Sequence, residues 1–140
     1  MTIGVRYYTR SGNTEKLAKA IGAALNVEAE PVTAPLHEKV DILFMGASYY
    51  AFDMDPAVKS FLEDHKEKIG QIVCFGTSAA MKSMKKPMKK VTEPLGLVLS
   101  EEEFHCRGAF GPLHKNRPNE EDLKKLAEFA IKVVSDGYEG

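Results

Sequence analysis

The stretch Ile3 to Thr14 reads IGVRYYTRSGNT, and the interpretation of the whole chain begins there. Its first six residues have the alternating pattern of a β-strand. The next six are mostly small residues with hydroxyl or amide groups, and an amphipathic helical pattern follows at once. The first N–H groups of a helix have no partner within that helix, and the helix dipole favours negative charge there. A strand, such a turn and a helix are therefore typical of an anion-binding loop.

The side chains of this loop suit a phosphate group. Most can donate a hydrogen bond, and the glycine tolerates backbone geometry that strains other residues. The loop consists of Thr9, Arg10, Ser11, Gly12, Asn13 and Thr14. Hydrogen bonds to a charged acceptor contribute about 1.5–3 kcal/mol each, so several converging donors can hold a phosphate without a metal. Arg10 either adds a countercharge or projects into solvent. The alternative is an ordinary turn with Thr14 as the helix N-cap.

The composition favours a single soluble domain. The chain has 140 residues, enough for one domain with a well-buried core, and we expect residues 1–140 to form it. Nineteen basic residues against twenty acidic ones leave a formal charge of −1, so the overall charge favours neither nucleic-acid nor membrane binding. Cys74 and Cys106 are the only cysteines in the sequence, and it contains no signal-peptide pattern or long apolar run. These features predict a cytoplasmic protein with reduced thiols.

Strand and helix patterns alternate along the chain. Continuous apolar runs predict strands buried on both faces, whereas apolar residues three and four apart predict helices packed on a sheet. The predicted strands cover residues 3–8, 27–32, 40–47, 71–76 and an interrupted pair at 97–99 and 102–107. The predicted helices cover residues 14–25, 55–66, the lysine-rich stretch from 81 and the region from 118 onward. The alternation predicts an α/β fold, a three-layer doubly wound parallel sheet of five strands.

Three local features refine this outline. The strand at 27–32 is short and polar, as an edge strand often is. Residues 33–39 are too few for an ordinary crossover helix, so a short turn or irregular segment is expected there. Pro87 is expected to break or kink the third helix.

Two more loops of small residues follow buried strands. In open α/β sheets, ligands bind beyond the carboxyl ends of the strands, so both loops are candidates for contact with a flat ring. The first contains Ser48, Tyr49, Tyr50, Ala51 and Phe52, whose aromatic rings either stack on a ligand or fill the core. The second contains Gly76, Thr77, Ser78, Ala79 and Ala80, whose small side chains allow the backbone to approach a ligand closely.

Lysines interleave with methionines after the second of these loops. From Lys82 to Lys90 the basic residues recur on one side of the predicted helix, and the methionines lie on the other. The pattern indicates either a surface helix that buries its methionines, or a docking face for an acidic redox partner or a phosphorylated nucleotide.

The run from Thr9 to Thr14 resembles the T-x-[ST]-G-[NT]-T phosphate loop of flavodoxins, and the resemblance extends over nearly the whole chain. It implies the strand order 2-1-3-4-5 and FMN as the cofactor. The 5′-phosphate is then held by the loop after the first strand, and the flavin ring by the loops Ser48 to Phe52 and Gly76 to Ala80. This chain departs from typical flavodoxins in its balanced charge and its lack of tryptophan. Either Met81 stacks on the second face of the ring, or that face is open to a partner or substrate.

The resemblance implies an electron carrier more than a self-sufficient enzyme, because in flavodoxins the flavin performs the electron transfer. Redox proteins are then the partners, with docking on the basic stretch from Lys82 to Lys90, and the protein is a monomer or a weak homodimer. No catalytic residue or metal ligand is required. The alternatives are a small NAD(P)H-dependent FMN quinone or flavin reductase, whose open flavin face accepts hydride directly, and a non-catalytic flavin-binding module.

Three other phosphate-handling classes fit the sequence less well. Response-regulator receivers need acidic residues after the first strand and an aspartate after the third, and this chain lacks both. Low-molecular-weight tyrosine phosphatases need a cysteine in the first loop, which here holds none. Nucleotide triphosphatases need the G-x-x-x-x-G-K-[ST] motif, which is also missing.

Overall fold

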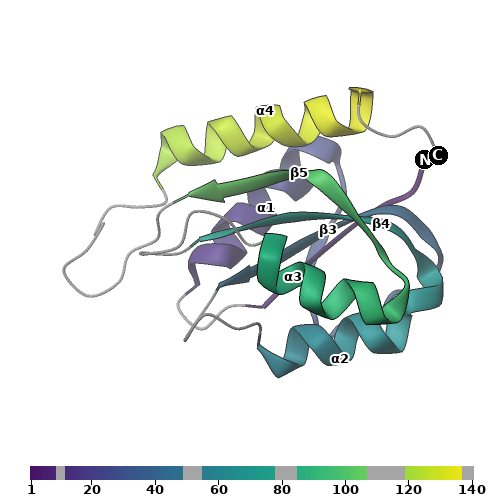
Figure 1. The fold of residues 1–140 in the computed structure, drawn as a ribbon. Coiled ribbons are helices and arrows are strands. Elements are labelled where there is room, and N and C mark those ends of the chain that lie inside the picture. The colour runs from purple at the N-terminus through teal and green to yellow at the C-terminus, as the bar shows by residue number, and fades with distance from the viewer. Residues whose placement is uncertain (9–11, 49–54, 78–84, 107–118, 137–140) are drawn as a thin grey trace.

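The computed structural model describes residues 1–8, 12–48, 55–77, 85–106 and 119–136 (Figure 1). The strands are β1 (Ile3–Tyr7), β2 (Ala29–Pro31), β3 (Val40–Ser48), β4 (Ile69–Thr77) and β5 (Val98–Cys106). The α-helices are α1 (Asn13–Leu25), α2 (Pro56–His65), α3 (Lys85–Thr92) and α4 (Glu120–Asp136). Short 3₁₀ turns follow α2 at Lys66–Lys68 and α3 at Glu93–Leu95.

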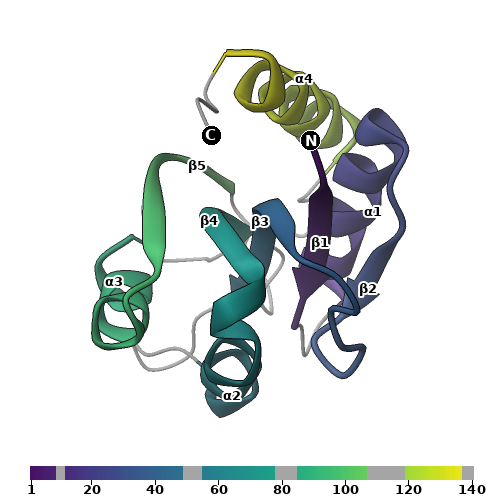
Figure 2. The same cartoon turned by 90° about the vertical axis from the view of Figure 1, so that its right-hand side faces the viewer.

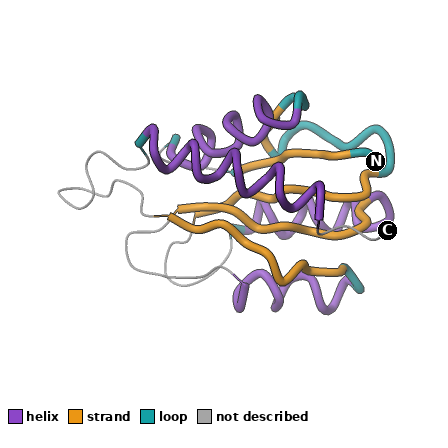
Figure 3. Tube along the Cα trace, turned by 90° about the horizontal axis from the view of Figure 1, so that it is seen from above, coloured by secondary structure: helices purple, strands orange, loops and turns teal. Residues whose placement is uncertain are grey.

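The strands form one parallel sheet in the order β2-β1-β3-β4-β5. Helices α1 and α4 cover one face and α2 and α3 the other (Figure 2), while Figure 3 shows the strands running side by side. The predicted three-layer doubly wound fold and its strand order are confirmed. The edge position of β2 is also confirmed, although the strand is shorter than the predicted span.

Apolar residues fill the space on both faces of the sheet. Along β3, Ile42 and Phe44 belong to the cluster under α1 and α4, whereas Leu43, Met45 and Ala47 belong to the cluster under α2 and α3. All five are fully buried. The continuous apolar run of β3 thus supplies both cores, which is why it reads as a central strand rather than an alternating one.

The connection from β2 to β3 contains no helix, as its length predicts. The backbone N–H of Ala34 donates to the Pro31 carbonyl at 2.9 Å and makes a tight turn. Leu36 is buried with Val40 and Leu43 in the core beside β1. Gly4 on β1 lies beside this cluster, and an added Cβ there would meet only side-chain carbons, the nearest being Val40 Cγ1 at 3.2 Å. An irregular segment therefore covers this part of the sheet.

Arg6 on β1 donates hydrogen bonds to the segment between β2 and β3. Its Nε donates to the Ala34 carbonyl at 3.0 Å and its Nη2 to the Pro35 carbonyl at 2.9 Å. Its Nη1 donates to the Val5 carbonyl at 3.0 Å, and Nη2 also lies 3.1 Å from Glu30 Oε2. Arg6 is only 7% exposed, and burial lowers its pKa while the negative charges of Glu30 and Glu28 oppose that shift. The planar guanidinium of Arg6 has several N–H donors in a fixed arrangement, so it can bond to several carbonyls at once, whereas the ammonium group of a lysine cannot match this geometry.

Side-chain caps start two of the helices. In α2, Pro56 is the first residue, and Asp55 caps it by accepting a hydrogen bond from the Ala57 N–H at 2.9 Å. Before α4, Asn119 and Asp122 exchange hydrogen bonds: the Asp122 N–H donates to Asn119 Oδ1 at 3.0 Å, and the Asn119 N–H donates to Asp122 Oδ2 at 2.8 Å. This reciprocal pair satisfies two backbone donors that the helix itself cannot.

The expectation for Pro87 was wrong. Helix α3 runs from Lys85 to Thr92 without a break, and Pro87 is its third residue. The first four N–H groups of a helix have no acceptor within it, so a proline here removes no helical hydrogen bond. Pro87 and Met88 face inward and are buried, which confirms the inward methionine at this position.

Two strand boundaries also differ from expectation. Gly70 lies inside β4 instead of in the turn before it, and a Cβ there would lie 2.4 Å from the Asp41 carbonyl oxygen on β3. Strand β5 is continuous where an interruption was expected. Its register shifts instead: Ile72 pairs with Leu99, but Cys74 pairs with Glu103. Strand β5 therefore has extra residues between these two pairs. They form an irregularity in the hydrogen-bond ladder, and the strand continues beyond it.

Within the described ranges, none of the helices is both long enough and apolar enough to cross a bilayer.

Candidate functional site

The carboxyl ends of four neighbouring strands meet at one edge of the sheet (Figure 1). Tyr7 at the end of β1 pairs with Gly46 on β3, and Ser48 at the end of β3 pairs with Thr77 at the end of β4. Thr77 also pairs with Cys106 at the end of β5. Since the predicted phosphate loop and both predicted ring loops leave these ends, the three loops begin side by side.

The predicted phosphate loop enters α1 through Gly12. Gly12 has φ +87°, a left-handed conformation that L side chains rarely adopt, and it caps the helix without a side-chain hydrogen bond. The helix then starts at Asn13, so the alternative reading of Thr14 as the N-cap is wrong. Asn13 is 7% exposed and Thr14 is fully buried. Two polar side chains are therefore enclosed at the positive end of the α1 dipole.

Gly46 allows this first turn of α1 to sit close to the sheet. A Cβ on Gly46 would lie 2.4 Å from Phe75 Cζ and 2.9 Å from Thr14 Cγ2. The backbone of Gly46 also accepts a hydrogen bond from the Tyr8 N–H at 3.1 Å, at the point where β1 enters the loop. The predicted strand 40–47 includes Gly46, but the sequence pattern does not predict the contact of Gly46 with Thr14.

We expect Gly46→Ala to lower the free energy of unfolding by about 1–3 kcal/mol, because the new methyl group overlaps a fully buried ring. Urea denaturation followed by circular dichroism measures the change. The matched control is Gly4→Ala on β1, whose added Cβ meets nothing closer than 3.2 Å and should change stability by less than about 1 kcal/mol. Equal effects of the two variants would contradict the packing described for Gly46.

A second set of contacts steadies the same turn of α1. Burial raises the pKa of the Tyr7 hydroxyl, as does the nearby Glu15 carboxylate, which accepts a hydrogen bond from it. Glu15 Oε2 also lies 3.0 Å from Lys19 Nζ, and that hydrogen bond and charge raise the pKa of Lys19. The one acid in the first turn of α1 is thus tied to the end of β1 and paired with a cation. The helical spacing of Glu15 and Lys19 predicts their pairing, but the tie to Tyr7 depends on the fold.

The other predicted site residues are only partly placed. Gly76 is buried in β4 opposite Ala47, and Ser48 and Thr77 end their strands. The remaining residues of the three loops lie outside the described residues and stay predictions: Thr9, Arg10, Ser11, Tyr49, Tyr50, Ala51, Phe52, Ser78, Ala79 and Ala80, with Met81 beside them.

Cys74 lies on β4, three residues before its end, and is 1% exposed. Burial raises the pKa of its thiol well above the usual range, and the charge of Glu103 adds to the shift. A thiol that stays protonated is a poor nucleophile, so Cys74 serves as a small apolar residue of the core. Within the described ranges, no three His, Cys, Asp or Glu side chains come together as a metal site.

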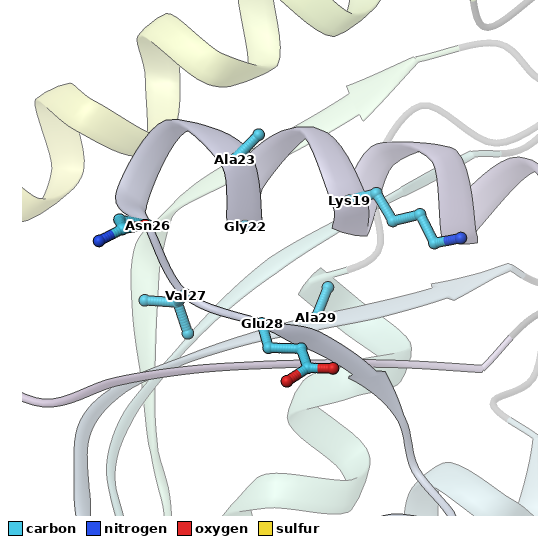
Figure 4. Close-up of a pocket in the computed structure, with 7 residues that line it drawn as sticks. All are labelled: Lys19, Gly22, Ala23, Asn26, Val27, Glu28 and Ala29. Atoms are coloured by element: carbon cyan, nitrogen blue, oxygen red, sulfur yellow. The ribbon is translucent and has the colours of Figure 1, made fainter.

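Two recesses lie on the β2 side of the molecule. One, of about 430 Å³, lies between the second half of α1 and the segment entering β2, and Figure 4 shows Lys19, Asn26 and Glu28 around it. The other, of about 390 Å³, lies beside the crossover segment and is lined by Arg6 and His37 among others. Neither recess is lined by a residue predicted to contact the cofactor.

Comparison with known proteins finds related chains. A family model described as a flavodoxin domain matches residues 5–110. An uncharacterised protein of Methanocaldococcus jannaschii is 30% identical over 138 residues, covering 89% of this chain and 91% of that protein. A structure of a flavodoxin from the domain Archaea aligns with a TM-score of 0.78 at 16% identity, covering 96% of this chain and 97% of that chain. A flavoprotein from Lactobacillus acidophilus in complex with FMN aligns with a TM-score of 0.60 at 15% identity, covering 74% and 92%.

Proposed function

This chain belongs to the flavodoxin family, and we propose that it binds FMN and serves as an electron carrier between redox proteins. The observation that carries the proposal is the start of α1: a left-handed Gly12 leads into a helix whose first two polar side chains are enclosed beside the carboxyl edge of the sheet. A helix start of this kind favours an anionic group. The FMN complex of the Lactobacillus acidophilus flavoprotein supports the choice of cofactor.

The phosphate of FMN would be held by the loop Thr9 to Thr14. Asn13 and Thr14 supply an amide and a hydroxyl from the first turn of α1, and Ser11 and Thr9 supply further hydroxyls from the loop. The α1 dipole adds a favourable potential for the negative charge. Lys19 offsets the charge of Glu15, so the acid in this turn opposes the phosphate less than an unpaired one would.

The flavin ring would lie against the loops after β3 and β4. Ser48 to Phe52 bring three aromatic side chains to one of these loops, and Gly76 to Ala80 bring small residues whose backbone N–H groups can approach the ring closely. The register of β3 with β4 supports this arrangement, because it starts the two loops at paired residues, Ser48 and Thr77.

When bound, FMN supplies the electron-transfer chemistry. The chain binds the phosphate, orients the ring and limits the access of water to it. No proton donor, nucleophile or metal from the protein is required for these roles.

We expect the FMN-loaded protein alone to oxidise NADPH no faster than free FMN does, because an electron carrier receives its electrons from another protein. Steady-state NADPH oxidation, followed with and without an added NADPH-dependent flavoprotein reductase, measures this. Rapid NADPH oxidation by the protein alone would overturn the carrier role and favour a small quinone or flavin reductase, without affecting the proposal of FMN binding.

A further inference from the structure

Helix α3 presents lysines to solvent along one side. Four of its eight residues are lysines, Lys85, Lys86, Lys89 and Lys90, whereas the buried side is made by Pro87, Met88 and Thr92. Lys86, Lys89 and Lys90 are exposed, with 65% of the Lys89 side chain accessible. We call these three residues the lysine face. The expected split between an inward methionine and outward lysines is thus present over the described part of the helix.

The stability of α3 accounts for only part of this pattern, because Lys89 and Lys90 lie in the last turn, where the helix dipole favours positive charge. Lys85 and Lys86 occupy the first turn, where the helix dipole disfavours positive charge and where α3 has no acid. Lys86 and Lys90 are four residues apart, and so are Lys85 and Lys89, which places like charges next to each other. Each arrangement destabilises an isolated helix. A sequence chosen only for folding would therefore place acids at some of these positions.

Ion pairs within the chain compensate only part of this charge. Lys85 Nζ lies 3.3 Å from Glu101 Oε2 on β5, whose side chain is 97% exposed. Lys89 Nζ lies 3.7 Å from Glu93 Oε1, a long contact between two side chains that are each 65% exposed. Among the described residues, no ion pair involves Lys86 or Lys90. Most of the positive charge of the lysine face is therefore not neutralised by the described acidic residues, so it can attract a negatively charged group of another molecule.

The position of α3 relates this charge to the proposed cofactor site. The helix follows the loop that leaves β4, and its amino end lies toward the carboxyl edge of the sheet (Figure 1). A partner that docks on the lysine face would therefore be brought close to the edge where we place the flavin.

We propose that the lysine face is the docking surface for an acidic redox protein; this rests on the proposed function as an electron carrier. Complementary charge mainly steers and orients such encounters. A protein fits the surface better than a nucleotide does, because the three lysines are exposed along one side of a helix and so present a spread-out positive surface. A nucleic acid fits poorly, because the chain as a whole has a formal charge of −1.

The test uses a labelled [2Fe–2S] ferredoxin of net negative charge as the probe, titrated with the full chain at about 0.01 M and about 0.15 M salt and followed by fluorescence anisotropy. We expect the wild type to bind more tightly at the lower salt. The variant Lys86→Glu/Lys89→Glu/Lys90→Glu should bind at least about tenfold more weakly there, since three attractive charges become repulsive. The variant with glutamine at the same positions should lie between the two.

The matched control reverses three exposed lysines on α4, Lys124, Lys125 and Lys132, which changes the net charge equally. It should bind the probe within about threefold of wild type. Equal losses in both charge-reversed variants, or no binding by the wild type, would overturn the proposal. It would also be overturned if reversal of the lysine face removed binding of 2′,5′-ADP but not of ferredoxin, an outcome that points to a nucleotide site. FMN retention, measured separately on each variant, distinguishes a failure of docking from a failure of cofactor binding.

Discussion

The double variant Ser11→Ala/Thr14→Val is expected to bind FMN about 100-fold more weakly than the wild type does, while its affinity for riboflavin changes less than about threefold. Only FMN carries the phosphate that these two hydroxyls are proposed to contact. Hydrogen bonds to a charged group contribute about 1.5–3 kcal/mol each, and about 1.4 kcal/mol corresponds to a tenfold change in affinity. Valine keeps the methyl group that packs beside Gly46, so the substitution removes the hydroxyl with little change in shape. Flavin fluorescence quenching measures both affinities.

The control for this pair is Thr92→Val, which also replaces a buried threonine but lies at the end of α3. The Thr92 hydroxyl donates to the Lys89 carbonyl at 3.5 Å, so its loss should cost little stability and leave the affinities for both flavins unchanged. If the double variant lost affinity for riboflavin and FMN equally, the two hydroxyls would contact the flavin ring or stabilise the fold. The assignment of the loop as the phosphate site would then be wrong.

Replacing Arg6 by methionine is expected to lower the free energy of unfolding by about 3 kcal/mol. Methionine fills a similar length but leaves the Ala34 and Pro35 carbonyls without the donors that Arg6 provides. A hydrogen bond that involves a charged group contributes about 1.5–3 kcal/mol, and the substitution removes two such bonds from the guanidinium to part-buried carbonyls. The segment between β2 and β3 should lose its structure first. It contains no helix, so its backbone depends on the hydrogen bonds that Arg6 donates to Ala34 and Pro35. Urea denaturation gives the total loss, and hydrogen exchange of residues 32–39 locates it.

Glu30→Gln separates the ion pair of Arg6 from its bonds to carbonyls. The Glu30 side chain is 38% exposed, and partly exposed ion pairs contribute little, so we expect a loss below about 1 kcal/mol. An Arg6→Met loss no larger than that of Glu30→Gln would mean that the carbonyl contacts do not stabilise the segment.

The architecture could be predicted because it depends on local patterns. The unbroken apolar run of β3 marks a central strand, and Asp55 followed by Pro56 marks the start of α2. The short link before β3 rules out a crossover helix on length alone. In each case, the property that sets the structure is carried by neighbouring residues in the sequence.

Contacts between distant residues could not be predicted in the same way. Arg6 looks like one polar position in a strand, and its bonds to Ala34 and Pro35 exist only once the crossover segment folds over β1. The close approach of Gly46 to Thr14 likewise depends on the register of the sheet and on the path of α1. Pro87 was misread because its effect depends on where the helix starts, and helix boundaries are the least certain part of a sequence pattern.

For the candidate site, the structure describes where the predicted loops begin but not the contacts that they make. The location of the site follows from three loops that leave neighbouring parallel strands, and the structure places those strand ends together. The enclosure of Asn13 and Thr14 and the pairing of Glu15 with Lys19 add detail at the start of α1, where we propose that the phosphate binds. The contacts of the flavin ring remain predictions, because most of the residues concerned lie outside the described ranges.

The most direct test of the central claim is the flavin content of the purified protein. The protein should be yellow, or become so when mixed with one equivalent of FMN and passed through a desalting column. Heat denaturation should then release a flavin that co-migrates with FMN, and not with riboflavin or FAD, in liquid chromatography. A folded protein that stays colourless after incubation with excess FMN would contradict the claim that this chain is an FMN-binding electron carrier.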